Sequence, residues 1–221
     1  MDKMKNNSDI ICVTNRHLCK DDYRERLVKI AKAHPGGIIL REKDMSEEEY
    51  RELAKWFLPI CRKEETGIFL HYFYEVAMEL KPDGLHLPLP LLEKICFEKG
   101  VLKADNLSDK LGVTHLGASC HSLEDAIKAE QLGCTYILAG HIYDTDCKKN
   151  LPGRGVGFLK EITNKTTIPV YAIGGITPNN IKEVRAAGAA GACIMSSAME
   201  SENVNKLLLQ CKNNAKWKDG N

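Results

Sequence analysis

Four histidines of this 221-residue sequence follow short apolar stretches, where a side chain could transfer a proton. They are His71, His86, His121 and His141. Imidazole titrates near neutral pH and is therefore well suited to acid–base chemistry. His121 lies in "GASCHSLEDA" (117–126), between the end of an apolar stretch and Ser122, which is placed to cap a helix. It is the candidate base of greatest interest, with a merely polar loop residue as the alternative, whereas His86 is expected to pack within "GLHL".

Two cationic residues end another apolar stretch. Arg41 and Lys43 are two positions apart in "REK", so on an extended segment their side chains can face the same side. Two neighbouring cations suit a phosphate or carboxylate ligand. The alternative, which the residues alone leave open, is that Arg41 pairs with Glu42 and is structural.

Small residues follow the last two apolar stretches, in "AIGGITPNN" and "IMSSA". Glycine lets the backbone approach an anion closely, and backbone N–H groups then supply the hydrogen bonds. We therefore predict a phosphate site formed by Gly175, Ser196 and Ser197. The alternative is that Gly174 and Gly175 only turn the chain.

A long polar segment, "AGHIYDTDCKKNLPGRGVG" (139–157), is typical of either a binding loop or a solvated surface excursion. Lys148 and Arg154 could reach an anion from it. No histidine pair has metal-ligand spacing such as H-E-x-x-H, so we expect no protein-held transition metal.

The elements that would position these residues alternate regularly. Apolar stretches occur at 10–14, 36–41, 67–71, 83–87, 114–119, 135–140, 168–175 and 191–197. Continuous apolarity predicts strands buried on both faces, as in parallel sheets, and segments such as 46–65 and 177–189 look helical. Eight alternations favour a (β/α)8 TIM barrel over an open doubly wound sheet. We expect one domain over residues 1–221, with its core at about 10–213 and polar ends, and an active site at the carboxyl ends of the strands.

Composition limits the partners that this chain is expected to have. Thirty-one basic and 30 acidic residues leave a formal charge of +1, so neither nucleic acid nor a membrane is an expected partner. Nine scattered cysteines suggest reduced thiols in a cytoplasmic protein. The polar start "MDKMKNNSDI" does not look like a signal peptide. The sequence is compatible with a homodimer but does not indicate one.

Several motifs together resemble the thiamine-phosphate synthase/TenI superfamily. They are "ICVTNR", "LREK", "DGLHL", "ASCHSLEDA", "AGHIYDTDCKK" and "PVYAIGGITPNNIKEVRAAGAAG", in the family's order, from about residue 10 to 200. The resemblance implies a (β/α)8 barrel that binds a phosphorylated thiazole.

Two branches of that superfamily differ in their chemistry. The resemblance implies that synthases couple a pyrimidine diphosphate to a thiazole phosphate with magnesium, held by an Asn-Asp motif and a second Asp. Here His71-Tyr72 and Leu91 occupy those positions, and Ile39 replaces a usual Gln. Magnesium requires oxygen ligands, so these replacements argue against a synthase. The segment "GHIYDTDCKKNLPGRGV" resembles the TenI branch instead.

The expected function is therefore a TenI-like thiazole tautomerase, an isomerase of thiamine biosynthesis that aromatises a carboxythiazole phosphate. The resemblance assigns proton transfer to His121 in the "SCHS" motif. Gly175, Ser196 and Ser197 would bind the phosphate, and Arg41, Lys43 or Lys148 would neutralise the carboxylate. No cofactor is expected. One alternative is thiamine-phosphate synthase, a transferase that would need magnesium, and another is a non-catalytic regulatory protein that binds thiazole or thiamine phosphates.

Overall fold

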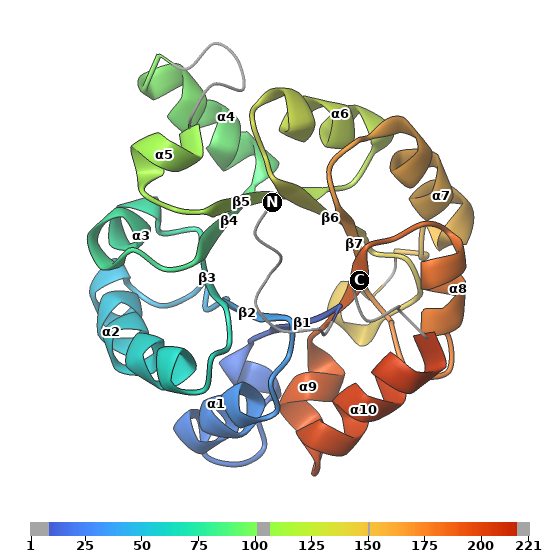
Figure 1. Cartoon of the computed structure of the whole chain (residues 1–221), viewed down its shortest axis with the longest axis horizontal. Coiled ribbons are helices and arrows are strands. Elements are labelled where there is room, and N and C mark those ends of the chain that lie inside the picture. Colours follow the sequence, from blue (N-terminus) through green and yellow to red (C-terminus); the bar gives the residue numbers. More distant parts are fainter. Residues whose placement is uncertain (1–8, 101–106, 150, 216–221) are drawn as a thin grey trace.

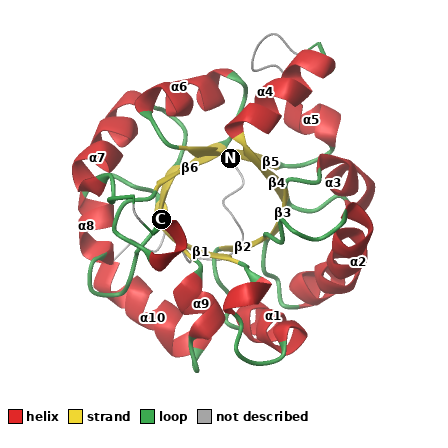
Figure 2. Ribbon diagram, turned by 180° about the vertical axis from the view of Figure 1, so that it is seen from behind, coloured by secondary structure: helices red, strands yellow, loops and turns green. Residues whose placement is uncertain are grey.

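A closed barrel of eight parallel strands forms the centre of the chain, in a computed structural model that describes residues 9–100, 107–149 and 151–215. Each strand pairs with the next, and β8 pairs with β1. The strands are β1 Ile10–Val13, β2 Gly37–Leu40, β3 Ile68–His71, β4 Gly84–Pro88, β5 His115–Cys120, β6 Tyr136–Gly140, β7 Val170–Ile173 and β8 Gly191–Ile194. Figure 1 shows the helices as an outer ring around these strands, and Figure 2 shows the same ring from behind.

The helices of the outer ring vary in length from single turns to four turns. They are α1 Tyr23–Lys32, α2 Glu47–Lys63, α3 Tyr74–Leu80, α4 Leu89–Glu98, α5 Leu107–Leu111, α6 Leu123–Gln131, α7 Gly155–Lys165, α8 Ile181–Ala186, α9 Ser196–Glu200 and α10 Val204–Ala215. Two 3-10 turns, η1 Arg16–Leu18 and η2 Asp146–Lys148, lie in loops. None of the described helices is both long and apolar enough to cross a membrane.

The predicted (β/α)8 barrel is confirmed, and each predicted apolar stretch overlaps one strand, with β4 and β5 each ending one residue beyond their stretches. Two other boundaries differ further from the prediction. The last strand ends at Ile194, and the predicted continuation through 197 is instead the start of α9. The helix predicted over 177–189 begins only at Ile181, because the Asn180 side chain accepts a hydrogen bond from the Thr177 N–H (2.8 Å) and holds a turn there.

The closed bottom of the barrel is filled by three aromatic side chains, Phe69, Tyr136 and Tyr171. Glycines on the neighbouring strands provide the room for them. A Cβ at Gly117 would lie 2.2 Å from Tyr136 Cζ, and one at Gly84 would lie 2.4 Å from Phe69 Cδ1. Such contacts are impossible for a larger residue, so these glycines are required by packing rather than by a turn. This aromatic layer closes the barrel below the carboxyl ends of the strands.

Helix α2 is anchored to the carboxyl ends of two strands by a buried tyrosine. Ser46 and Glu49 form a capping box that starts the helix. Four residues after Ser46, Tyr50 is fully buried, and its hydroxyl donates to the Leu40 carbonyl (2.6 Å) while it accepts from the His71 N–H (2.9 Å). This hydroxyl fixes the ends of β2 and β3, which carry Arg41 and His71.

Candidate active site

A pocket of about 340 Å³ opens at the carboxyl ends of the barrel strands. All seven residues predicted to form the site line it: Arg41, Lys43, His121, Lys148, Gly175, Ser196 and Ser197. They come from five strand ends that are far apart in the sequence, and the barrel closure brings them together. Their individual roles in binding or catalysis remain predictions.

Three cations form one wall of the pocket. The pKa of Lys43 is lowered by partial burial and then by Arg41 and Lys148, so the three charges are close enough to repel one another. The pKa of Lys148 is likewise lowered by burial and by Arg154. Repulsion among neighbouring cations is relieved when an anion binds between them. The wall is therefore suited to a phosphate or diphosphate.

Glu42, between the two cations of "REK", is buried and hydrogen bonds to groups other than Arg41, although burial lowers the pKa of Arg41 and the Glu42 charge acts against that lowering. Its Oε1 accepts from the Thr14 hydroxyl (2.8 Å) and from the Tyr23 hydroxyl (2.6 Å). Its Oε2 accepts from the Arg16 N–H (3.0 Å), with the Arg16 guanidinium at 3.8 Å. The sequence left open whether Arg41 forms a structural ion pair with Glu42. In the structure Glu42 pairs with Arg16 instead. Alternation along the chain leaves Arg41 and Lys43 facing the pocket.

The loop after β7 brings the backbone to the pocket edge. Gly174 and Gly175 have φ values of +100° and +64°, which favour glycine. A Cβ at Gly175 would lie 2.5 Å from the Asp144 carbonyl oxygen. Asn180 Nδ2 also donates to the Gly175 carbonyl (2.9 Å) and fixes the loop. Glycine is therefore needed here both for the turn and for close contact with the β6 loop.

The long loop after β6 is held down at several points. The Gly153 N–H donates to Asp144 Oδ1 (2.7 Å), His141 Nε2 bonds to the Leu151 carbonyl (3.1 Å), and the Arg154 N–H donates to the His141 carbonyl (2.9 Å). Lys148 and Cys147 line the pocket, and the Arg154 guanidinium instead lies 5.4 Å from the Phe158 ring centroid. Of the two cations predicted from this segment, only Lys148 belongs to the pocket wall.

His121 lies at the end of β5 with a defined tautomer. Its Nδ1 is 2.8 Å from the Gly140 carbonyl oxygen, which can only accept a hydrogen bond. When the ring is neutral, the proton is therefore on Nδ1 and the lone pair is on Nε2. The His121 N–H donates to Asp125 Oδ2 (2.7 Å), which holds the backbone against the start of α6. His121 is thus positioned to accept a proton through Nε2.

His86 and His71 form the floor of the pocket. His86 is buried within "GLHL" as expected, but it also lines the pocket and bonds to Tyr136 Oη (3.2 Å) and Ser119 Oγ (2.9 Å). Burial lowers its pKa to about 3. The His71 ring lies 6.0 Å from it, at 24°. Burial, then His86, Arg41 and Lys43, lower the pKa of His71 well below its usual value, so both rings are neutral.

Sequence reasoning did not select Ser119 or Cys147 as pocket residues. Ser119 could have been found from alternation along β5, because Gly117 and Ser119 point into the barrel while Cys120 packs outside it. Cys147 lies in the segment 139–157 that the sequence marked as a possible binding loop, but its place in the pocket depends on how η2 folds.

Magnesium does not fit the side chains of this pocket. No Asp or Glu is among its lining residues within the part of the chain that the structure describes, and no cluster of metal-ligating side chains occurs there. Glu93, Glu124 and Asp125 line an adjoining hollow beyond His121, where Glu93 is paired with Lys128. Because magnesium prefers carboxylate oxygens, the pocket lacks the ligands for it.

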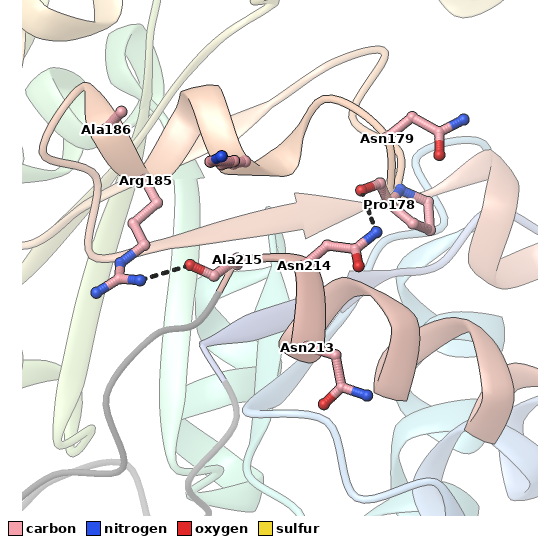
Figure 3. A pocket seen from close by; sticks show the side chains of 8 residues that line it. Pro178, Asn179, Arg185, Ala186, Asn213, Asn214 and Ala215 are labelled. Carbon is pink, nitrogen blue, oxygen red and sulfur yellow. Dashed lines mark hydrogen bonds between the residues drawn. The ribbon is translucent and has the colours of Figure 1, made fainter.

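A second hollow lies on the outside of the barrel, between α8 and α10 (Figure 3). Its polar groups bond to one another: Arg185 Nη1 donates to the Ala215 carbonyl (2.7 Å), and Asn214 Nδ2 donates to the Pro178 carbonyl (2.8 Å). These bonds join two helices, so we assign the hollow a structural role.

The sequence as a whole matches one family. The family model described as thiamine monophosphate synthase matches residues 10–198. The chain belongs to this family. Thiamine-phosphate synthase of Clostridium tetani is 31% identical over 202 residues, covering 88% of this chain and 89% of that protein. The enzyme of that name from Clostridium botulinum is 31% identical over 219 residues, covering 95% of both.

The fold agrees with this assignment. The structure of thiamine phosphate pyrophosphorylase from Pyrococcus furiosus superposes with a TM-score of 0.77 at 26% identity, covering 96% of each chain. The superfamily resemblance inferred from the motifs is confirmed at this level. Membership of the TenI branch in particular is not supported.

The thiazole tautomerase interpretation is contradicted by these relatives. Proteins about 30% identical over most of the chain are named thiamine-phosphate synthase, a transferase, so the isomerase assignment fails with it. The structure explains why the loop motif was misleading. "TDCKK" forms a turn, capped by the Thr145 side chain, that brings Lys148 to the pocket wall. A lysine at the pocket wall is compatible with either reaction and does not select between them.

Proposed function

We propose that this chain is a transferase of the thiamine-phosphate synthase type, which joins a pyrimidine diphosphate to a thiazole phosphate in the barrel-mouth pocket. The observation that carries the proposal is that the pocket has two different anion-binding features. One is the cationic wall of Arg41, Lys43 and Lys148, and the other is the backbone rim at Gly175 and Ser196–Ser197. A reaction between two phosphorylated substrates requires two such features.

In this proposal the cationic wall binds the diphosphate and stabilises the negative charge that develops as it leaves. Charged hydrogen bonds to phosphate oxygens are among the strongest that proteins form. The rim of Gly175, Ser196 and Ser197 binds the thiazole phosphate through N–H and hydroxyl groups. The thiazole nitrogen carries no proton to be removed in this coupling, so His121 acts in it as a hydrogen-bond acceptor through Nε2 and not as a base. The pocket supplies no carboxylate for magnesium, so charge stabilisation by the chain's own residues depends on the three cations.

The test is to incubate the protein with both substrates and to measure thiamine phosphate and released diphosphate, with magnesium chloride and with EDTA. We expect thiamine phosphate and diphosphate to form in equal amounts. A folded protein that forms neither product in either buffer would refute the transferase proposal. The Lys148→Ala variant should lose turnover while retaining its melting temperature, which would link the activity to this pocket.

A second candidate is a barrel that binds thiamine phosphate without turnover. The observation that favours it is the pocket without Asp or Glu among its described lining residues. Diphosphate departure is harder to stabilise without a metal ion. Binding of thiamine phosphate by calorimetry, together with no product from the two substrates, would support this candidate over the first.

A further inference from the structure

Three side chains form a hydrogen-bonded chain that runs from the aromatic layer of the barrel to the pocket. The His86 ring contacts Tyr136 Oη through Nδ1 (3.2 Å) and Ser119 Oγ through Nε2 (2.9 Å). Tyr136 is buried and does not line the pocket, whereas Ser119 is only partly buried and does line it. His86 therefore links a phenol outside the pocket to a hydroxyl group inside it.

The inner end of this chain sets the direction of its hydrogen bonds. Burial raises the pKa of Tyr136 well above its usual value, so the hydroxyl keeps a hydrogen to donate. Within the described residues, His86 Nδ1 is the hydrogen-bond partner of that hydroxyl. If Nδ1 carried a proton of its own, the Tyr136 hydrogen would be left inside the barrel without an acceptor, which buried groups rarely tolerate. Tyr136 is therefore the donor, and His86 Nδ1 is the acceptor.

The tautomer of His86 then fixes the outer end of the chain. Because burial lowers the pKa of His86 to about 3, its neutral ring carries a single proton. With Nδ1 as the acceptor, that proton is on Nε2, which donates to Ser119 Oγ. The hydrogen of the Ser119 hydroxyl must then point away from the His86 ring, and no other described group accepts it. It is left on a side chain that lines the pocket.

We propose that His86 is a positioning residue, which together with Tyr136 holds the Ser119 hydroxyl as a hydrogen-bond donor toward the pocket. Without this chain, the hydroxyl can rotate and present either its hydrogen or its lone pairs. A fixed donor favours a ligand atom that accepts a hydrogen bond and disfavours an N–H or O–H group at the same place. The effect on ligand binding rests on the proposed function, because it needs a ligand in this pocket, whereas the direction of the chain does not.

The direction of the chain is tested by long-range ¹H–¹⁵N spectra of the wild-type chain at neutral pH without ligand. We expect the Nε2 resonance of His86 in the range of protonated imidazole nitrogens and its Nδ1 resonance in the range of unprotonated ones. In Tyr136→Phe the donor to Nδ1 is removed, so both tautomers become accessible and the two resonances should move toward each other. A wild-type ring with its proton on Nδ1 would overturn the proposal.

A second measurement asks whether Tyr136 acts through Ser119. Calorimetry compares thiamine phosphate binding by the wild-type chain, Tyr136→Phe, Ser119→Ala and the double variant. We expect Ser119→Ala to weaken binding about 2- to 10-fold, as for one neutral hydrogen bond, and Tyr136→Phe about 2- to 5-fold. In the Ser119→Ala background, Tyr136→Phe should have no further effect, because the hydroxyl that it orients is gone.

Tyr171→Phe is the matched control for this comparison. Tyr171 belongs to the same aromatic layer, with its ring centroid 6.0 Å from that of Tyr136, and both nitrogens of His86 are engaged by other residues. Tyr171→Phe should leave the affinity for thiamine phosphate unchanged. Equal losses from Tyr136→Phe in both backgrounds, or the same loss from Tyr171→Phe, would assign the effect to packing and overturn the positioning role. A wild-type chain with the expected tautomer that does not bind thiamine phosphate would refute the proposed function and support only the direction of the chain.

Discussion

Replacing Glu42 by Gln is expected to destabilise the barrel mouth and weaken its cationic wall. The buried carboxylate accepts three hydrogen bonds, from Thr14, Tyr23 and the Arg16 backbone. Glutamine has nearly the same shape, but its amide can accept at only one of the two oxygen positions. The NH₂ group would then face the Arg16 N–H, and two donors would oppose each other.

The magnitude follows from those three bonds. A hydrogen bond to a charged group contributes about 1.5–3 kcal/mol and a neutral one about 0.5–1.5 kcal/mol. One bond lost and two weakened by about 1 kcal/mol each give a loss of about 4 kcal/mol in the free energy of unfolding. For a chain of this size that lowers the melting temperature by about 8–16 °C. Thr14 Oγ1 also accepts from the Arg41 N–H (2.9 Å), so Arg41 should lose its fixed position and phosphate should bind more weakly.

The assay is thermal unfolding followed by circular dichroism, with phosphate affinity measured below the transition. Glu52→Gln is the matched control, because the Glu52 side chain is 61% exposed and pairs only with Lys55 among the described ion pairs. That control should change stability by less than about 0.5 kcal/mol. If Glu42→Gln melts within 2 °C of wild type, the argument that this carboxylate holds the cations in place is wrong.

Three further outcomes are expected. Arg41→Ala and Lys148→Ala should each weaken binding of inorganic diphosphate about 10-fold or more by calorimetry, since each removes a charged hydrogen bond worth about 1.5–3 kcal/mol; unchanged affinity would remove the cationic wall from the site. Gly175→Ala should cost about 1–3 kcal/mol in urea unfolding, because its φ of +64° and the Asp144 carbonyl exclude a Cβ. His86, with a pKa of about 3, binds a proton less readily in the folded than in the unfolded state, so stability should fall as pH drops from 6.5 towards 3, and NMR should show a neutral ring down to about pH 4.

The repeat of apolar stretches made the barrel predictable. Strands buried on both faces need no polar alternation, so each one was visible as a continuous apolar run, and the carboxyl-end rule then located the site residues. Loop bonds were harder to anticipate. Asn180 lies three residues from Thr177 and Arg154 four from Phe158, so both contacts are local. The sequence pattern does not show which of several neighbouring groups such a side chain contacts.

The branch of the family was mispredicted. The segment "GHIYDTDCKKNLPGRGV" resembles the TenI branch, and His71, Tyr72 and Leu91 replace magnesium ligands, which argues against a synthase. Relatives that match most of the chain are nevertheless named thiamine-phosphate synthase.

The pocket combines charges that repel one another with a neutral floor, and this arrangement favours a ligand of corresponding shape. The lowered pKa values of Lys43 and Lys148 show that their charged forms are destabilised in the empty pocket. A buried carboxylate next to them would remove that cost, yet Glu42 is turned away and bonded to Thr14 and Tyr23. His71 and His86 stay neutral beneath the cations, so the positive charge of this pocket wall comes from Arg41, Lys43 and Lys148, and an anion between them would offset their mutual repulsion.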